Sequence, residues 1–181
     1  MAANRNRRGR DHRRDYMLTF QQVDSAERIA EVVRLAREIW QEHYVPIIGQ
    51  KQVDYMLEKF QSERAIAAQL AQAYQYYLFA RDRKNAGYVA TLPNATEATL
   101  MLSKIYVRKS ERGCGLGKKA LQFIEDLGKK RGLKLLWLTV NKNNDDSIAW
   151  YSRMGFRKVG AVIQDIGAGF VMDDFRMEKP L

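Results

Sequence analysis

The stretch 105–118 (IYVRKSERGCGLGK) combines residue types that can bind an anion. Its three glycines, within 113–117, can turn backbone N–H groups toward a bound group without obstruction by a Cβ atom. The helix expected to follow adds partial positive charge at its N-terminus. Arg112, Lys118 and Lys119 add full charges. The pattern predicts a phosphate or pyrophosphate site, although a tight helix entry alone would also explain the glycines.

Two familiar phosphate-binding loops do not fit this stretch. A Walker A loop requires a hydroxyl residue after its Gly-Lys pair, and Lys119 stands at that position. A dinucleotide fingerprint that starts at Gly113 requires glycine at position 118, which is lysine. The loop also follows the fourth expected strand, whereas the dinucleotide fingerprint opens its fold. The anion site therefore needs another explanation.

The elements that position the loop form one α/β domain over residues 16–181. Asp24 is expected to cap a helix whose apolar residues share one face, and Pro46 is expected to end it. The run 133–140 (LKLLWLTV) is typical of a strand buried on both faces. A turn is expected at Pro93-Asn94. The expected strands are 17–23, 74–81, 87–92, 98–108, 133–140, 156–165 and 169–178. The expected helices begin near residues 24, 50 and 62, a fourth follows the loop 113–117 and ends near residue 132, and a fifth spans about 144–154.

Two motifs in this order resemble the GNAT acetyltransferases. The first is the pattern R/Q-x-x-G-x-G/A, and the second is N-x-x-(A/S)-x-x-x-Y-x-x-x-G-F, over 144–156. The resemblance covers roughly residues 17–179 and implies a mixed central sheet of about seven strands flanked by four to five helices. The first motif reads Arg112, Gly113, Cys114, Gly115, Leu116 and Gly117.

The sequence around the motifs is similar to that of the PaiA-type polyamine (spermidine/spermine) N-acetyltransferases. The similar segments are 44–49 (YVPIIG), 53–57 (VDYML), 138–143 (LTVNKN) and 165–174 (DIGAGFVMDD). This resemblance implies transfer of an acetyl group from acetyl-CoA to a small primary amine, within a ternary complex and without a metal. A peptide or protein N-terminus and another small amine, such as an amino sugar, remain open as acceptors.

The GNAT resemblance assigns roles to individual residues. Backbone groups of Ile105, Tyr106 and Val107 would meet the pantetheine arm, with Val107 polarising the thioester carbonyl. The segment from Arg112 to Lys118 would hold the pyrophosphate. Asn144 would meet a pantetheine amide, with Ser147 beside it in the same motif. Tyr151 would protonate the departing sulfur, because a phenol with a pKa of about 10 keeps its proton at neutral pH.

Spacing along the second motif has a consequence of its own. Asn144 and Tyr151 lie seven residues apart, about two helical turns, so a helix would place them on one face. A core position beside Phe156 is the alternative for Tyr151.

The sequence identifies neither a covalent nucleophile nor a general base. Cys114 could form a covalent acyl-enzyme, but neither histidine of the chain, His12 or His43, lies near it in sequence. A polyamine nitrogen must lose a proton before it attacks, yet the sequence identifies no general base. His43 is available but also fits a helix end. Carboxylates that could attract a polycation are Asp54, Glu58, Asp165, Asp173, Asp174 and Glu178.

The net charge of +10 is divided between two parts of the chain. Residues 1–15 hold six arginines and two aspartates, so we expect a disordered basic arm, either a solvated tail or a tether to RNA or an acidic partner. The remaining +6 keeps open a nucleic-acid-binding protein or a CoA-sensing regulator with a GNAT-like body. One cysteine and no long apolar run fit a cytoplasmic protein without a membrane partner, and a homodimer remains open.

Overall fold

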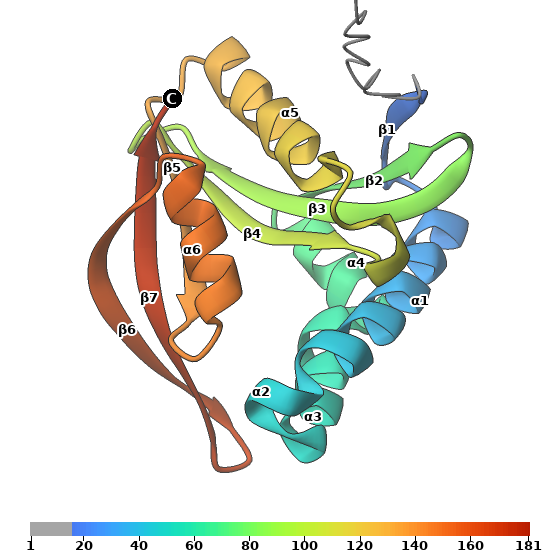
Figure 1. Ribbon diagram of the computed structural model, residues 1–181, viewed down its shortest axis with the longest axis vertical. Coiled ribbons are helices and arrows are strands. Elements are labelled where there is room, and N and C mark those ends of the chain that lie inside the picture. Colours follow the sequence, from blue (N-terminus) through green and yellow to red (C-terminus); the bar gives the residue numbers. More distant parts are fainter. Residues whose placement is uncertain (1–15) are drawn as a thin grey trace, which may run out of the picture.

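The computed structural model describes residues 16–181, so the basic arm expected at 1–15 lies outside the described residues. The elements alternate as the sequence predicts, with a helical insertion between the first two strands (Figure 1). In chain order they are β1 (Leu18–Gln22), α1 (Ala26–His43), α2 (Val45–Ile48), α3 (Gln50–Gln61), α4 (Glu63–Ala71), β2 (Gln75–Arg81), β3 (Lys84–Asn94), β4 (Thr99–Val107), α5 (Leu116–Lys130), β5 (Leu135–Asn141), α6 (Asp145–Arg153), β6 (Arg157–Gly167) and β7 (Phe170–Pro180).

Seven strands form one mixed sheet in the order β1-β2-β3-β4-β5-β7-β6. Every neighbouring pair is antiparallel except β4 and β5, which run parallel with α5 as the crossover. This confirms the α/β fold with a mixed seven-stranded sheet.

Helices cover both faces of the sheet (Figure 1). One hydrophobic core lies under α5 and includes Leu121 and Ile124, with residues of α6 packed at its margin. A second core lies under α1, α3 and α4 and includes Leu35, Ile39 and Tyr88. The two cores divide the molecule into an α5–α6 face and an α1–α4 face, and these two names are used below.

The sheet opens between β4 and β5. Their pairing covers only three positions, from Thr99 opposite Leu135 to Met101 opposite Trp137. Beyond Met101 the two strands no longer pair, although each continues for several residues. The remainder of β4 therefore has an edge without a strand partner, in the interior of the sheet.

A bulge in β4 changes which side chains face which core. Lys104 lies opposite Ala90, but Leu102 lies opposite the next residue, Thr91, so Ser103 is the extra residue. Leu102 packs in the core under α5, whereas Lys104 lies on the α1–α4 face with Tyr76. Without the bulge, residues 102 and 104 would share a face.

Local predictions needed four corrections. Ser25, not Asp24, caps α1, because its hydroxyl accepts the Arg28 N–H while Asp24 pairs with the Arg28 side chain. Pro46 ends α1 but also fits the first turn of the short helix α2. With α2, residues 16–181 contain six α-helices rather than the four to five expected.

The third and fourth corrections concern strands. β3 runs through the expected turn, because Pro93 lies beyond the last residue paired with β2 and no ladder bond is lost there. β5 is buried at alternate positions only, since the helices of the α1–α4 face do not fully cover it.

Candidate active site

The predicted anion loop is built from two left-handed glycines and a helix start. Gly113 and Gly115 have φ of +81° and +83°, and a Cβ atom at either position would meet nothing within 4 Å. Gly117 has a different role, since a Cβ atom there would lie 3.3 Å from the Trp150 ring of α6. Two glycines therefore set the backbone path and the third permits close helix packing.

The loop presents a row of backbone donors. Gly115 begins α5 without any side-chain cap. The N–H groups of residues 113–118 donate to no acceptor within residues 16–181, and regular helical bonding begins with the Lys119 N–H to the Gly115 carbonyl at 3.1 Å. Free amides at the positive end of a 15-residue helix form an anion site, which fits the pyrophosphate of CoA.

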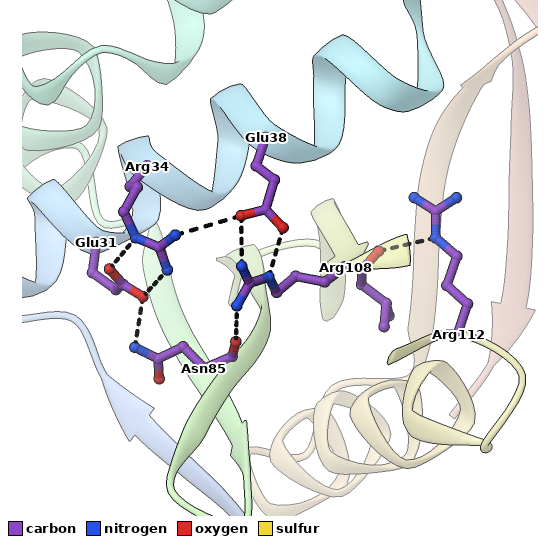
Figure 2. Close-up of polar contacts among 7 residues, drawn as sticks. Glu31, Arg34, Glu38, Asn85, Arg108 and Arg112 are labelled. Carbon is purple, nitrogen blue, oxygen red and sulfur yellow. Dashed lines mark hydrogen bonds and ion pairs between the residues drawn. The ribbon is translucent and has the colours of Figure 1, made fainter. Parts of the chain in front are cut away.

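Arg112 joins this loop to the unpaired edge of β4. Its Nε donates to the Val107 carbonyl at 3.0 Å (Figure 2). The Arg108 N–H donates across the ladder to Ala86 at 2.9 Å, so the alternation of antiparallel bonding directs the backbone groups of Ile105 and Val107 away from β3. The N–H and C=O groups of Ile105 and Val107 therefore point out from the edge of β4 that has no pairing with β5. Tyr106 has the opposite orientation, and its backbone bonds to β3.

An ion-pair network holds α1 against the end of β4 (Figure 2). Arg108 donates from Nε and Nη2 to both carboxylate oxygens of Glu38, at 2.6 and 2.8 Å. Arg34 lies between Glu38 and Glu31, and Asn85 donates to Glu31 at 2.8 Å. Two parallel bonds fix the orientation of a guanidinium, so this network sets the position from which the loop departs.

Asn144 lies at the start of α6 but outside the helix. Its backbone angles are φ −95° and ψ 65°, and its Oδ1 accepts the Ser147 N–H at 3.4 Å. The helix therefore begins one residue later than predicted, with Asn144 as its N-cap residue, and helical spacing alone does not place Asn144 on one face with Tyr151. Its Nδ2 lies 3.4 Å from Nε2 of His43, and the residue is only 3% exposed.

His43, at the end of α1, lies near a residue of each motif: Arg112 of the first and Asn144 of the second. Burial and the nearby Arg112 lower its pKa, against the opposing effects of Asn144 and Asp146. A lowered pKa keeps the imidazole neutral at pH 7. The sequence offered no signal for this position, because the contact depends on how α1 packs across the sheet.

Tyr151 lies within a cluster of aromatic side chains. Its ring centroid lies 5.0 Å from Trp150 and 5.5 Å from Phe156, so the alternative of a core position beside Phe156 describes part of its surroundings. Burial raises the pKa of Tyr151, and Tyr44 adds to the effect. The phenol is therefore protonated across the physiological range and can donate its proton.

Tyr44 extends this aromatic cluster to the α1–α4 face. Its ring lies 6.2 Å from that of Tyr106, and Tyr106 in turn lies 5.2 Å from Tyr88. Burial raises the pKa of Tyr44, Tyr88 and Tyr106. The three phenols and Tyr151 are referred to below as the tyrosine cluster.

Cys114 makes structural contacts within the loop. Its thiol lies 3.0 Å from the Glu111 carbonyl, and Arg81 lies 3.5 Å from its sulfur. Its own carbonyl accepts from the Tyr16 hydroxyl at 3.2 Å. No histidine is among these partners.

The β6–β7 hairpin closes the α1–α4 face at its tip. Tyr55 and Lys59 of α3 both donate to the Ile166 carbonyl. Gln52 donates to the Val171 carbonyl at 3.3 Å. Figure 1 shows the hairpin turn on the side of the molecule that carries α2 and α3. The tip of the hairpin is thus joined to α3 of the helical insertion.

Most carboxylates that could attract a polycation already have partners. Asp174 differs, since it is 8% exposed and forms no ion pair among residues 16–181. The partners of the others are Gln41 and Gln50 for Asp54, Arg64 for Glu58, the Gly167 N–H for Asp165, Lys142 for Asp173 and Arg176 for Glu178.

Lys104 is a second buried charge on the same face. Its Nζ donates to Gln69 Oε1 at 2.8 Å and to Ser103 Oγ at 3.3 Å, and no carboxylate lies within ion-pair distance in the described residues. Burial lowers its pKa to about 7. A charged residue within the apolar run TLMLSKIYV was the sequence signal for it, and Asp174 in VMDDF carries the same kind of signal.

Sequence comparison decides the family. The profile of the acetyltransferase (GNAT) family matches residues 31–156, most of the described chain. The chain belongs to the GNAT family. It is an N-acetyltransferase, and its acetyl donor is acetyl-CoA.

Individual relatives agree with this membership. An uncharacterized N-acetyltransferase in the pepI 3′ region of Lactobacillus delbrueckii subsp. lactis is 24% identical over 87% of this GNAT chain and 94% of its own. The ribosomal protein bS18-alanine N-acetyltransferase of Escherichia coli K12 is 32% identical, over 54% of this chain and 64% of its own length.

The solved structures confirm the GNAT fold. The PaiA N-acetyltransferase from Thermoplasma acidophilum, in complex with coenzyme A, superposes with a TM-score of 0.74 over 91% of this chain and 99% of its own, at 19% identity. At that identity the likeness concerns the fold, so the acceptor of this GNAT protein has to be argued from its own residues.

Two further features concern the described residues alone. No group of three or more His, Cys, Asp or Glu side chains within residues 16–181 is arranged to hold a metal ion. Within the same residues, no helix has the length and apolar character needed to cross a membrane.

Proposed function

We propose that this protein acetylates a polyamine such as spermidine or spermine, by direct transfer in a ternary complex. The observation that carries the proposal is Asp174, a buried carboxylate without an ion-pair partner in residues 16–181, on the face bounded by the helical insertion and the hairpin. A buried carboxylate without a cation is costly unless a cationic ligand completes it. A protonated amine supplies that cation.

The catalytic roles follow from the two motifs. Bound acetyl-CoA supplies the acyl thioester. The free amides of the loop, together with Arg112 and Lys118, hold its pyrophosphate, and the backbone groups of Ile105 and Val107 meet its pantetheine arm. The Val107 N–H polarises the thioester carbonyl. Tyr151 donates its proton to the departing sulfur.

Asn144, Ser147 and His43 act on position rather than on the reacting atoms in this proposal. The Oδ1 atom of Asn144 accepts the Ser147 N–H. Its Nδ2 group lies beside His43 and can also contact the pantetheine arm. This contact connects α1 to α6 beside the loop that holds the pyrophosphate.

Acetylation of spermidine by purified protein tests the proposal. Acetyl-CoA and spermidine are incubated with the protein, and N-acetylspermidine and free CoA are quantified together by HPLC. Formation of both products in equal amounts supports a polyamine acceptor. CoA release without acetylspermidine, and equally without acetylspermine, contradicts it.

A peptide N-terminus is the second candidate acceptor, because the bS18-alanine N-acetyltransferase of Escherichia coli is 32% identical over the part it shares with this chain. A competition assay separates the two candidates. Spermidine and an alanine-initiated hexapeptide are supplied together at equal concentration, and the ratio of their acetylated products gives the ratio of kcat/KM.

A further inference from the structure

Asp174 lies on β7 at the place where the sheet opens. β7 pairs regularly with β5, with Asp174 opposite Asn141 and Arg176 opposite Thr139. Side chains alternate along a strand, so Asp174 shares a face with Met172 and Arg176. Met172 packs against the core under α1, α3 and α4, and Arg176 lies 4.2 Å from the ring of Trp137. Asp174 therefore lies on the α1–α4 face of β7.

Tyr44 is a neighbour both of Asp174 and of Tyr151, the candidate proton donor. The charge of Asp174 is near enough to raise the pKa of Tyr44, and Tyr44 in turn raises the pKa of Tyr151. Tyr44 of the tyrosine cluster thus lies near both a buried carboxylate and a half-buried, protonated phenol. Acetyl transfer to an amine requires one group that takes a proton and another that gives one.

The surroundings of Asp174 favour its role as a proton acceptor. Burial and the neighbouring Asp173 raise its pKa, whereas the Thr139 hydroxyl and the Lys142 ammonium lower it, and burial is the largest effect. Tyr44 faces it from the end of α1. A carboxylate with a raised pKa is a stronger base than a solvated one.

We propose that Asp174 is the catalytic carboxylate that binds the acceptor ammonium and takes its proton. This inference rests on the proposed function only in that the acceptor is a protonated amine.

The proton and bond changes balance within the site. One N–H proton passes to Asp174, and the freed lone pair forms the C–N bond to the acetyl carbon as the C–S bond breaks. Tyr151 protonates the sulfur, and the second amine proton restores Tyr151 through solvent. Asp174 then releases its proton to bulk water.

Asp174→Asn is the decisive variant, because the amide keeps the size and a hydrogen-bonding oxygen but cannot take the proton. Asp126→Asn is the control: this carboxylate is exposed on α5, where it accepts from Gln122 at 3.0 Å. Asp174→Asn should lower kcat/KM for spermidine at pH 7.5 by about 100-fold or more, as expected on loss of a general base. Asp126→Asn should change it by less than about threefold, since loss of an exposed surface contact has little effect.

The pH profile separates a base from a structural role. With Asp174 present, kcat/KM falls at acid pH as the carboxylate is protonated. In Asp174→Asn only amine that is already neutral reacts, so kcat/KM should rise about tenfold per pH unit up to the pKa of the amine, near 10. CoA affinity, measured by titration calorimetry, should be equal in both forms. Wild-type kcat/KM and an unaltered pH profile in Asp174→Asn would overturn the inference.

Basal hydrolysis of acetyl-CoA tests the base without any amine, because water takes the place of the acceptor. Release of CoA, followed by HPLC, should fall about tenfold or more in Asp174→Asn and stay unchanged in Asp126→Asn. If wild type does not acetylate spermidine but Asp174→Asn still loses hydrolysis, the polyamine acceptor is refuted and the role of Asp174 as general base is supported. Equal hydrolysis by wild type and Asp174→Asn would refute the base, whatever the acceptor.

Discussion

Replacement of Lys104 by methionine should remove a pH dependence from the stability of the protein. Lys104 is 8% exposed, and its Nζ contacts Gln69 and Ser103 rather than a carboxylate. Burial lowers its pKa from 10.5 to about 7. Methionine fills a similar volume and carries no titratable group, so the substitution deletes the titration while it keeps most of the packing.

The sign and size of the effect follow from linkage. Between pH 7 and 10.5 the unfolded chain binds a proton at Lys104 that the folded chain does not, so the free energy of unfolding rises with pH in this window. Each tenfold change in an ionisation constant corresponds to about 1.4 kcal/mol. Wild type should therefore gain up to about 1.4 kcal/mol per pH unit relative to Lys104→Met, and about 5 kcal/mol over the whole window.

Urea unfolding at pH 7, 8 and 9, followed by circular dichroism, measures this difference directly. The loss of hydrogen bonds to Gln69 and Ser103 shifts the stability of Lys104→Met by a constant and leaves its slope unaffected. Lys130→Met, at an exposed residue at the end of α5, should keep the wild-type slope. Parallel pH dependences for wild type and Lys104→Met would refute the reasoning, because they would mean that Lys104 stays charged in the folded protein.

Four further substitutions test the cofactor side of the site. Tyr151→Phe should lower kcat about tenfold or more with little change in CoA affinity, because only the proton donor is lost; an unchanged kcat would contradict the assignment. Cys114→Ser should keep wild-type turnover, since direct transfer needs no thiol nucleophile. Loss of activity in a folded Cys114→Ser variant would instead support a mechanism through a covalent acyl-enzyme. Gly115→Ala should cost roughly 1–2 kcal/mol of stability in a thermal or urea melt, as expected for alanine in a left-handed conformation, and should weaken CoA binding. Gly117→Ala, whose Cβ would press on Trp150 without a positive φ, is the contrast, and equal effects from both glycines would refute this division of roles.

Much of the fold could be read from the sequence, because its signals are local. Hydrophobic periodicity and turn residues predicted the order of strands and helices, and the glycine spacing predicted the loop that begins α5. The errors were also local. Asp24 and Ser25 are both good N-cap residues, and only the backbone geometry selects Ser25. Pro46 both stops α1 and starts α2, and the sequence pattern reports only the first.

The backbone path of the glycine loop was largely predictable, since the loop is one continuous segment with glycine at its left-handed positions. The acceptor side was not, since it is assembled from β4, β7 and the end of α1. Six carboxylates looked equivalent in the sequence, and only tertiary packing buries one of them, Asp174, beside the Thr139 hydroxyl and without an ion pair in the described residues. His43 reaches Asn144 across 101 residues of chain.

The sequence by itself thus determined the family, the element order and the glycine loop that begins α5, because residue types and spacings within short segments encode them. The tertiary structure decided which charges are buried and which face they occupy. Lys104 shows the physical reason. Strict alternation would place it beside Leu102 under α5, but one extra residue at Ser103 turns it to the α1–α4 face. A register shift of this kind depends on the pairing with β3, and no pattern within β4 records it.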